Sequence, residues 1–225
     1  MALDLSDCQF LGPALPEPFV RFELEKELTN RKLLPKTSGD EGRHRRSLWD
    51  VYRRHLQELA ASGGPLRVRN RVVEPLIELL GYKNLADADD VKTREDIESG
   101  GNLLLSTDGQ EKLRVWTTPF NEDLDTPAKR GRAYRFSHLR IAQRVLLACG
   151  ERIGLLTNGV ELRILISDPA RPDSQIIIPL DPGWKRHREV PDSFPLLLAL
   201  ACPQGVKAVP DVVDKARLQQ PRVTK

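Results

Sequence analysis

Apolar residues recur at helical spacing in the first third of the chain. In the segment 18–34, one helical face collects Phe19, Phe22, Leu24 and Leu28. In the segment 46–59, the corresponding stripe is Leu48, Val51 or Tyr52, Leu56 and Leu59. A polar stretch, 35–43, separates the two segments. The pattern predicts two amphipathic helices joined by a linker.

A third helix is expected over residues 66–80. The sequence Ser62-Gly63-Gly64-Pro65 ends the previous helix and starts this one, since proline suits a first helical turn. Pro75 should kink or divide the helix, because proline removes a backbone hydrogen bond. Gly81 stops it. The next residues, 83–101, are polar and acidic, so we expect a loop or an irregular strand there.

After the third helix the pattern changes from helical to extended. The runs 102–106 and 112–118, joined by the turn 107–110, predict a β-hairpin. After a long loop, Ser137 is a good N-cap for a helix over 138–149. The expected core face of that helix contains Leu139, Ala142, Val145 or Leu146, and Cys149.

A second hairpin follows this helix. Asn158-Gly159 joins the runs 152–157 and 160–167, and such a turn between two apolar runs is a strong hairpin signal. We expect a further strand over 175–180, then a short helix at 194–202 and a proline-punctuated tail. Helices, hairpin, helix, hairpin and strand in this order predict an α/β or α+β fold with a mixed sheet.

Composition adds general limits. The chain has 225 residues, enough for one sizeable core, and 30% of them are charged, as in ordinary globular proteins. The net charge of +3 does not by itself indicate a nucleic-acid partner. Cys8, Cys149 and Cys202 are scattered and odd in number, which argues against a disulfide framework or a zinc site. No apolar run approaches the roughly 18 residues that span a bilayer, and no signal peptide is evident. We therefore expect a soluble cytoplasmic protein with no membrane partner.

Between Arg71 and Asp181, several sequence motifs follow one another in a characteristic order. Leu79-Leu80-Gly81-Tyr82 ends a helix, a hairpin with an Asp-Gly turn follows, and the next helix bears Gln143. Gly154-Leu155-Leu156-Thr157-Asn158-Gly159 then leads into a strand. In this order they resemble the N-terminal nuclease-like domain of restriction–modification proteins. That domain is the PD-(D/E)XK fold at the start of type I motor subunits and of type IIG-like restriction–methyltransferase fusions.

The resemblance implies a division of the chain and a fold. A restriction-endonuclease-like mixed sheet flanked by helices would occupy residues 63–195. An N-terminal helical extension would precede it at 1–62, and a short helix with a proline-punctuated tail or linker would follow at 196–225. In the related proteins such a linker continues into a methyltransferase or a helicase.

The resemblance also implies where a nuclease site would be. Such nucleases hold Mg²⁺ with an Asp at the start of the first hairpin strand and a Glu-x-Lys in the second, because Mg²⁺ prefers oxygen ligands. Counted from the turn, the Asp position falls at Asn102. The Glu and Lys positions fall at Thr117 and Pro119, or at Trp116 and Thr118. None of these is a carboxylate or a lysine, so the site is expected to be degenerate.

Gln143 has two interpretations. In active relatives a glutamine on this helix lies beside the metal, whereas elsewhere such a residue is a surface or core-edge glutamine. The first interpretation predicts that Asn102, Thr117 and Gln143 surround a shallow cleft that binds no Mg²⁺.

A metal site could still form if the carboxylates had migrated. The candidates are Asp96, Glu98, Asp123 and Asp125. Charges in turns and loops are usually solvated, so we expect no cofactor, and Mg²⁺ only if the site is rearranged. The four histidines show no ligand spacing and are assigned no catalytic role.

Positive charge concentrates in two segments. One runs from Arg43 to Arg71 and includes Arg53 and Arg54. The other, 129–135, leads into a helix N-terminus, and its glycine-containing basic sequence with interleaved aromatics suits contact with phosphates. Its candidate contact residues, with two from the helix, are Lys129, Arg130, Arg132, Tyr134, Arg135, Arg140 and Arg144. Both segments could instead be solvated faces or ion-pair partners of nearby carboxylates.

Three functions are compatible with these patterns. The first is a non-catalytic nuclease-like domain with which a restriction–modification or other anti-phage defence protein engages double-stranded DNA. The second is an active Mg²⁺-dependent endonuclease with a rearranged site. The third is a module that docks a methyltransferase or a helicase motor without touching DNA. An exposed apolar patch near Phe19, Phe22 and Trp49 would favour the third.

Overall fold

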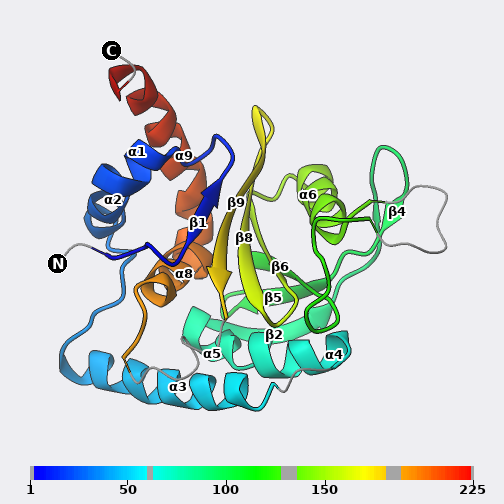
Figure 1. Ribbon diagram of the computed structural model, residues 1–225, viewed down its shortest axis with the longest axis horizontal. Coiled ribbons are helices and arrows are strands. Elements are labelled where there is room, and N and C mark those ends of the chain that lie inside the picture. Colours follow the sequence, from blue (N-terminus) through cyan, green and yellow to red (C-terminus); the bar gives the residue numbers. More distant parts are fainter. Residues whose placement is uncertain (1–2, 60–62, 128–135, 181–188, 224–225) are drawn as a thin grey trace.

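A mixed sheet forms the centre of the computed structural model, which describes residues 3–59, 63–127, 136–180 and 189–223. Within these residues seven strands pair in the order β1-β9-β8-β7-β6-β5-β2, and β3 and β4 form a separate hairpin (Figure 1). The strands are β1 Gln9–Leu11, β2 Tyr82–Asp87, β3 Val91–Lys92, β4 Ile97–Glu98, β5 Asn102–Ser106, β6 Lys112–Thr117, β7 Ile153–Thr157, β8 Glu161–Asp168 and β9 Arg171–Pro179. All neighbouring pairs are antiparallel except β6 and β7.

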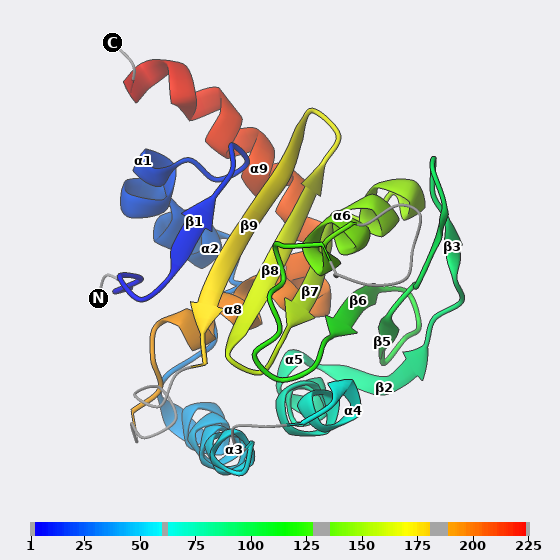
Figure 2. The ribbon, with the colours of Figure 1, turned by 45° about the vertical axis from the view of Figure 1, so that its right-hand side comes forward.

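Helical segments surround this sheet. They are α1 Glu17–Phe19, η1 Val20–Leu24, α2 Glu25–Asn30, α3 Gly39–Gln57, α4 Pro65–Val68, η2 Arg69–Val73, α5 Leu76–Leu80, α6 His138–Cys149, α8 Ser193–Ala201 and α9 Pro203–Val223. Figure 2 shows α6 on one face of the sheet and α8 and α9 on the other. The expected fold, a mixed α/β sheet flanked by helices with an N-terminal helical stretch, is confirmed.

Alternation along the strands divides the core between the two faces. In β6, Leu113 and Val115 join the large core on the side of α8 and α9, whereas Trp116 joins the smaller core under α6. In β8, Ile164 and Leu165 divide in the same way. Side chains point to alternate faces with a period of two, so strands covered by helices on both faces are largely apolar, although β6 and β8 also bury Arg114 and Arg163.

The expected hairpins and helix ends are confirmed. β5 pairs with β6, and β7 pairs with β8 across Asn158-Gly159. Gly159 has a φ of +80°, and a Cβ there would lie 2.8 Å from Leu59 Cδ2, so only glycine fits this turn. The Ser137 side chain accepts a hydrogen bond from the Arg140 N–H and caps α6. The third helix is interrupted just before α5, as Pro75 predicts.

Other expectations are wrong. The segment called a proline-punctuated tail is the 21-residue helix α9. Pro203 occupies its first turn, and the burial of Val209, Val212, Val213 and Ala216 offsets the local cost of Pro210 inside it. The linker also lies earlier than expected, at 31–38, because α2 ends at Asn30 and α3 already begins at Gly39.

Three further corrections concern exposure and strand order. The segment 83–101, expected as a loop or an irregular strand, contributes most of the edge strand β2 and contains the β3–β4 hairpin. Phe22 is 72% exposed, and Cys149 is exposed at the end of α6 rather than facing the core. Phe19 and Trp49, by contrast, are buried, and Trp49 packs against Phe194 with ring centroids 4.8 Å apart. The exposed apolar patch that would favour a docking module therefore does not form from these three residues.

In the described part of the chain, no single helix is long and apolar enough to cross a membrane. The pair α8 and α9 passes that test of length and composition only when the two are taken together, and they meet at a bend of 93°.

Candidate functional site

A cleft of about 530 Å³ lies at the end of the β5–β6 hairpin. Asn102, the first residue of β5, and Thr117, the last residue of β6, both line it, as expected. Gln143 does not: it lines a different hollow, of about 250 Å³, between α6 and the β8–β9 hairpin. Its Nε2 is buried and has no hydrogen-bond acceptor among the described residues. The expectation that the three residues surround one cleft is wrong for Gln143.

Strand register decides which side chains share a face with Asn102. Asn102 lies directly opposite Val115, and Thr117 is two residues further along β6, so these two share its face. Trp116 points to the other face, under α6. Val115 therefore lies opposite Asn102, and Thr117 follows on the same face. This pairing differs from both registers counted from the turn.

The positions that the resemblance assigns to the metal ligands carry no carboxylate and no lysine in this hairpin. Asp87, a carboxylate that lines the cleft, is hydrogen-bonded to Asn102 and Arg69. Asn102 is neutral, Val115 offers no oxygen, and Thr117 replaces neither a carboxylate nor an ammonium group. Among the described residues, no group of three or more His, Cys, Asp or Glu side chains could hold a metal ion.

Sequence reasoning missed two residues of the cleft, Arg69 and Asp87. Asp87 is opposite Asn102 in the β2–β5 pair, and its Oδ1 accepts hydrogen bonds from Asn102 Nδ2 at 2.7 Å and from Arg69 Nη1 at 3.2 Å. Arg69 Nε also lies 3.9 Å from Glu74 Oε1. The sequence pattern did not indicate strand β2 clearly. Once β2 is placed beside β5, Asp87 lies next to Asn102.

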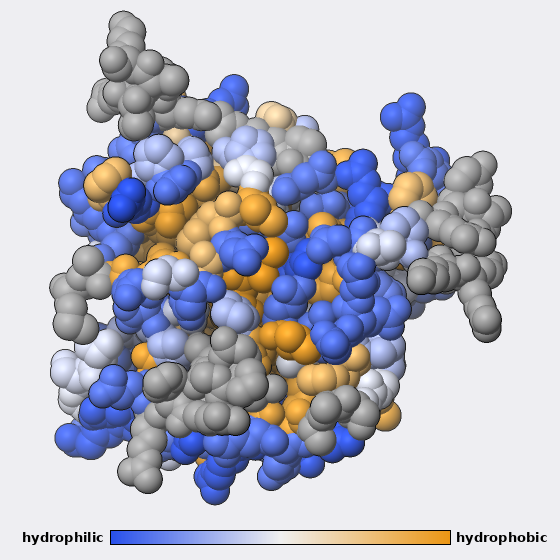
Figure 3. Space-filling view, viewed as in Figure 1, coloured by the Kyte–Doolittle hydropathy of each residue, from blue (hydrophilic) through white to orange (hydrophobic). Residues whose placement is uncertain are grey.

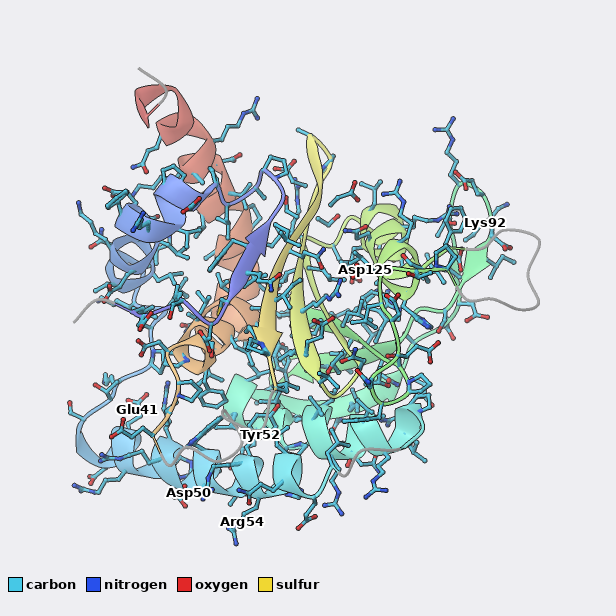
Figure 4. All side chains as sticks on the ribbon, in the orientation of Figure 1. Glu41, Asp50, Tyr52, Arg54, Lys92 and Asp125 are labelled. Carbon is cyan, nitrogen blue, oxygen red and sulfur yellow. The ribbon has the colours of Figure 1, made fainter. Side chains whose placement is uncertain are left out.

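Asp123 and Asp125, two of the candidate migrated carboxylates, shape the loop after β6. Asp123 Oδ1 accepts the backbone N–H groups of Asp125 and Thr126. Hydrogen bonds from Thr126 and from these N–H groups lower the pKa of Asp123. Asp125 binds Arg163 on both oxygens, at 2.7 and 2.8 Å, and Figure 4 shows it beside α6. Both carboxylates therefore have structural partners.

Asp96 and Glu98, the other two candidates, lie on the β3–β4 hairpin. Asp96 is exposed, and its Oδ1 accepts the Ile97 N–H at 2.8 Å. Glu98 is only 2% exposed, and its Oε1 lies 3.9 Å from Arg144 Nη2. Neither lines the cleft that contains Asn102.

Two expected DNA contacts on α6 are already engaged within the protein. Arg144 donates to Glu95 at 2.7 Å and to Thr93 Oγ1 at 2.7 Å, and its guanidinium lies 4.1 Å from the centre of the Phe136 ring. Its side chain is only 12% exposed. Because Thr93 and Glu95 belong to the β3–β4 hairpin, these bonds hold the hairpin against α6. Arg140 is exposed and pairs with Asp173 at 2.8 Å. Lys129, Arg130, Arg132, Tyr134 and Arg135 lie outside the described residues.

Arg53 and Arg54 lie on α3. Arg54 is exposed, and Figure 4 shows it pointing away from the body of the protein, whereas Tyr52 points inward. Among the described residues its one side-chain hydrogen bond runs from Nε to the backbone oxygen of Asp50, at 3.3 Å, so its remaining donors face no described acceptor. Arg53 is partly buried, 3.9 Å from Asp50. On the face shown in Figure 3, hydrophilic residues predominate, with hydrophobic ones reaching the surface near α4.

Arg163, a buried residue of β8, is expected to stabilise the fold. Burial alone would lower the pKa of Arg163, but hydrogen bonds to Asp125 and Glu161 outweigh it and keep the pKa raised. We expect Arg163→Gln to lower the free energy of unfolding by about 2 kcal/mol, because the charge-assisted hydrogen bonds to Asp125 and Glu161 are lost and Asp125 is partly solvated.

Urea titration measures this change. Arg140→Gln is the matched control, because it removes an exposed ion pair with Asp173 and should change the unfolding free energy by less than about 1 kcal/mol. Equal effects of the two substitutions would contradict a structural role for Arg163.

No protein-family model, no curated protein and no solved structure matches this chain. The functional conclusion below therefore rests on the site and on the resemblance given above.

Proposed function

We propose that the chain is a non-catalytic, nuclease-like domain with which a cytoplasmic restriction–modification or related anti-phage defence protein engages double-stranded DNA. One observation carries the proposal: Asn102 and Thr117 line a single cleft at the end of the β5–β6 hairpin. The resemblance assigns the metal-binding carboxylate and the Glu-x-Lys motif to this place. The cleft is there, but the positions assigned to the metal ligands hold Asn102, Val115 and Thr117 in place of the carboxylates and the lysine.

The order of elements supports the same proposal. Helix α5 precedes the antiparallel strands β2, β5 and β6, and α6 then leads to β7, which is parallel to β6. This contains the hairpin, helix and further strand on which the resemblance rests. A methyltransferase or a helicase is the proposed partner, as a domain or as a subunit, by the same resemblance.

Engagement of DNA is proposed to use arginines that the fold leaves without carboxylate partners. Arg54 and Arg46 on α3 are exposed, and neither forms an ion pair with a described carboxylate. The basic sequence 129–135 adds four charges. Phosphate contacts by such groups position a protein on a duplex without reading its sequence.

Metal titration and a cleavage assay test the proposal. Calorimetry with Mg²⁺ or Mn²⁺ should detect no binding at the cleft, because Asn102, Val115 and Thr117 replace the expected ligands. Plasmid DNA incubated with the protein and Mn²⁺ should remain uncut, while duplex DNA should bind at low salt.

Two results would contradict this proposal in different ways. A metal site that disappears in Asp123→Asn or Glu98→Gln, together with reproducible cutting, would establish an endonuclease with a rearranged site. No duplex binding at low salt would leave a docking module as the better account.

A further inference from the structure

Arg69 brings a guanidinium group into the cleft with most of its donors unused. The side chain is 24% exposed, and it makes one hydrogen bond within the described part of the chain, from Nη1 to Asp87. Its Nε is buried without an acceptor there. A guanidinium carries five N–H donors in a rigid fork that matches paired acceptors. Asp87 holds the fork in place, so Arg69 can bind a ligand with little loss of side-chain freedom.

The charges around Arg69 favour a neutral ligand over a phosphate. Two carboxylates already flank this single cation, Asp87 at 3.2 Å and Glu74 at 3.9 Å. A phosphate would be a third anion around one positive charge, and like charges at such distances repel. A neutral group with two acceptors meets no such repulsion.

The walls of the cleft are suited to a flat ring. Pro65, Leu66 and Ala88 line it beside Arg69, and Leu66 is 65% exposed. A cleft that combines apolar walls with a few oriented polar groups, here Arg69, Asp87 and Asn102, is typical of sites for small organic groups. A volume of about 530 Å³ leaves ample room for a nucleobase.

We propose that the cleft binds the O6 and N7 acceptor edge of a guanine through Arg69. This inference rests on the proposed engagement of DNA and gives that engagement a preferred base. Arginine donating to O6 and N7 is the most common base-specific contact of proteins with DNA. The cleft in which the nuclease site is degenerate would then recognise a guanine base by hydrogen bonding.

The test uses three short single strands that differ in one base: d(TpGpT), the same strand with 7-deazaguanine, and d(TpApT). All three carry the same phosphates. Binding is followed by the nuclear magnetic resonance shift of the Trp116 indole N–H, because Trp116 lines the cleft. We expect d(TpGpT) to bind about tenfold more tightly than the other two strands, since 7-deazaguanine lacks the N7 acceptor and adenine has an amino donor in place of the O6 acceptor.

Variants of Arg69 separate the effect of its paired N–H donors from the effect of its positive charge. Arg69→Lys keeps the charge but loses the paired donors, so the guanine preference should disappear, and Arg69→Gln should behave likewise. Arg217→Gln, on the exposed side of α9, should retain the tenfold preference. Circular dichroism checks that each variant is folded.

Several outcomes would overturn the inference. Equal affinity for the three strands would mean that phosphates, not the base, are bound. No shift with d(TpGpT), or a preference that survives in Arg69→Lys, would do so as well. None of these results affects binding of duplex DNA through α3 or the sequence 129–135, so the proposed function is judged separately by its own duplex titration.

Discussion

Trp116→Ala should lower the free energy of unfolding by about 3–5 kcal/mol. Trp116 is 8% exposed and packs in the core under α6 with Val145, Leu146 and Leu156. Its ring also fills the space above Gly154, where a Cβ would lie 3.1 Å from Trp116 Cζ3. Removing the indole leaves a cavity that these rigid neighbours cannot close. Urea titration followed by circular dichroism measures the change.

Trp116→Phe is the milder substitution. It keeps a six-membered ring in the core and removes the pyrrole part together with the hydrogen bond from Nε1 to the Ser99 oxygen, which is 3.1 Å long. We expect a loss of about 1–3 kcal/mol, smaller than that of Trp116→Ala, because less volume is vacated. An unchanged urea midpoint in Trp116→Ala would show that the side chain does not face this core. The sequence also predicts a structural role for Trp184, which lies outside the described residues.

Local signals in the sequence were sufficient for most of the fold. Asn158-Gly159, the cap at Ser137 and the break at Pro75 each act through nearby backbone geometry, which the sequence alone reveals. Strand β2 and helix α9 depend on distant partners instead. Tyr82 begins an edge strand whose exposed residues do not alternate clearly, and α9 contains prolines that only burial against the core outweighs.

The candidate site was predictable only in part, for a similar reason. Asn102 and Thr117 are joined by one hairpin, so a turn count brings them near each other. The turn 107–110 itself places Val115 opposite Asn102, so the two counted registers set the motif one or two residues too far along β6. Arg69 and Asp87 come from elements separated in the chain from that hairpin, and no local pattern indicates their contact with it.

Charge is the property that the sequence predicted least well. Arg144 and Arg140 look like available cations in a list of basic residues, yet both have carboxylate partners in the folded protein. The same holds for Arg45, which pairs with Glu41 at 2.7 Å. The partners of Arg144 and Arg140 come from segments far apart in the chain, whereas Glu41 lies one helical turn before Arg45 in α3.

Salt dependence of DNA binding is expected to identify the basic segment that contacts phosphates. If Lys129, Arg130, Arg132 and Arg135 each neutralise one phosphate, the slope of log affinity against log salt should be about −3.6, which is −0.9 for each contact. Affinity for a duplex would then fall about 150-fold between 50 and 200 mM salt. Fluorescence anisotropy with two unrelated duplexes measures the slope, which should be similar for both.

The two basic segments can be distinguished by matched fourfold variants. Changing Lys129, Arg130, Arg132 and Arg135 to glutamine should abolish nearly all of the slope, because each lost contact makes it shallower by about one unit. Changing Arg45, Arg46, Arg53 and Arg54 should have a smaller effect, because Arg45 and Arg53 face Glu41 and Asp50 within α3. If the second variant loses more affinity than the first, α3 is the phosphate-binding element. If neither variant changes binding, the proposal that these two segments contact phosphates is wrong. Between them the two variants remove eight cations, and the loss of any phosphate contact among these would make the salt dependence shallower.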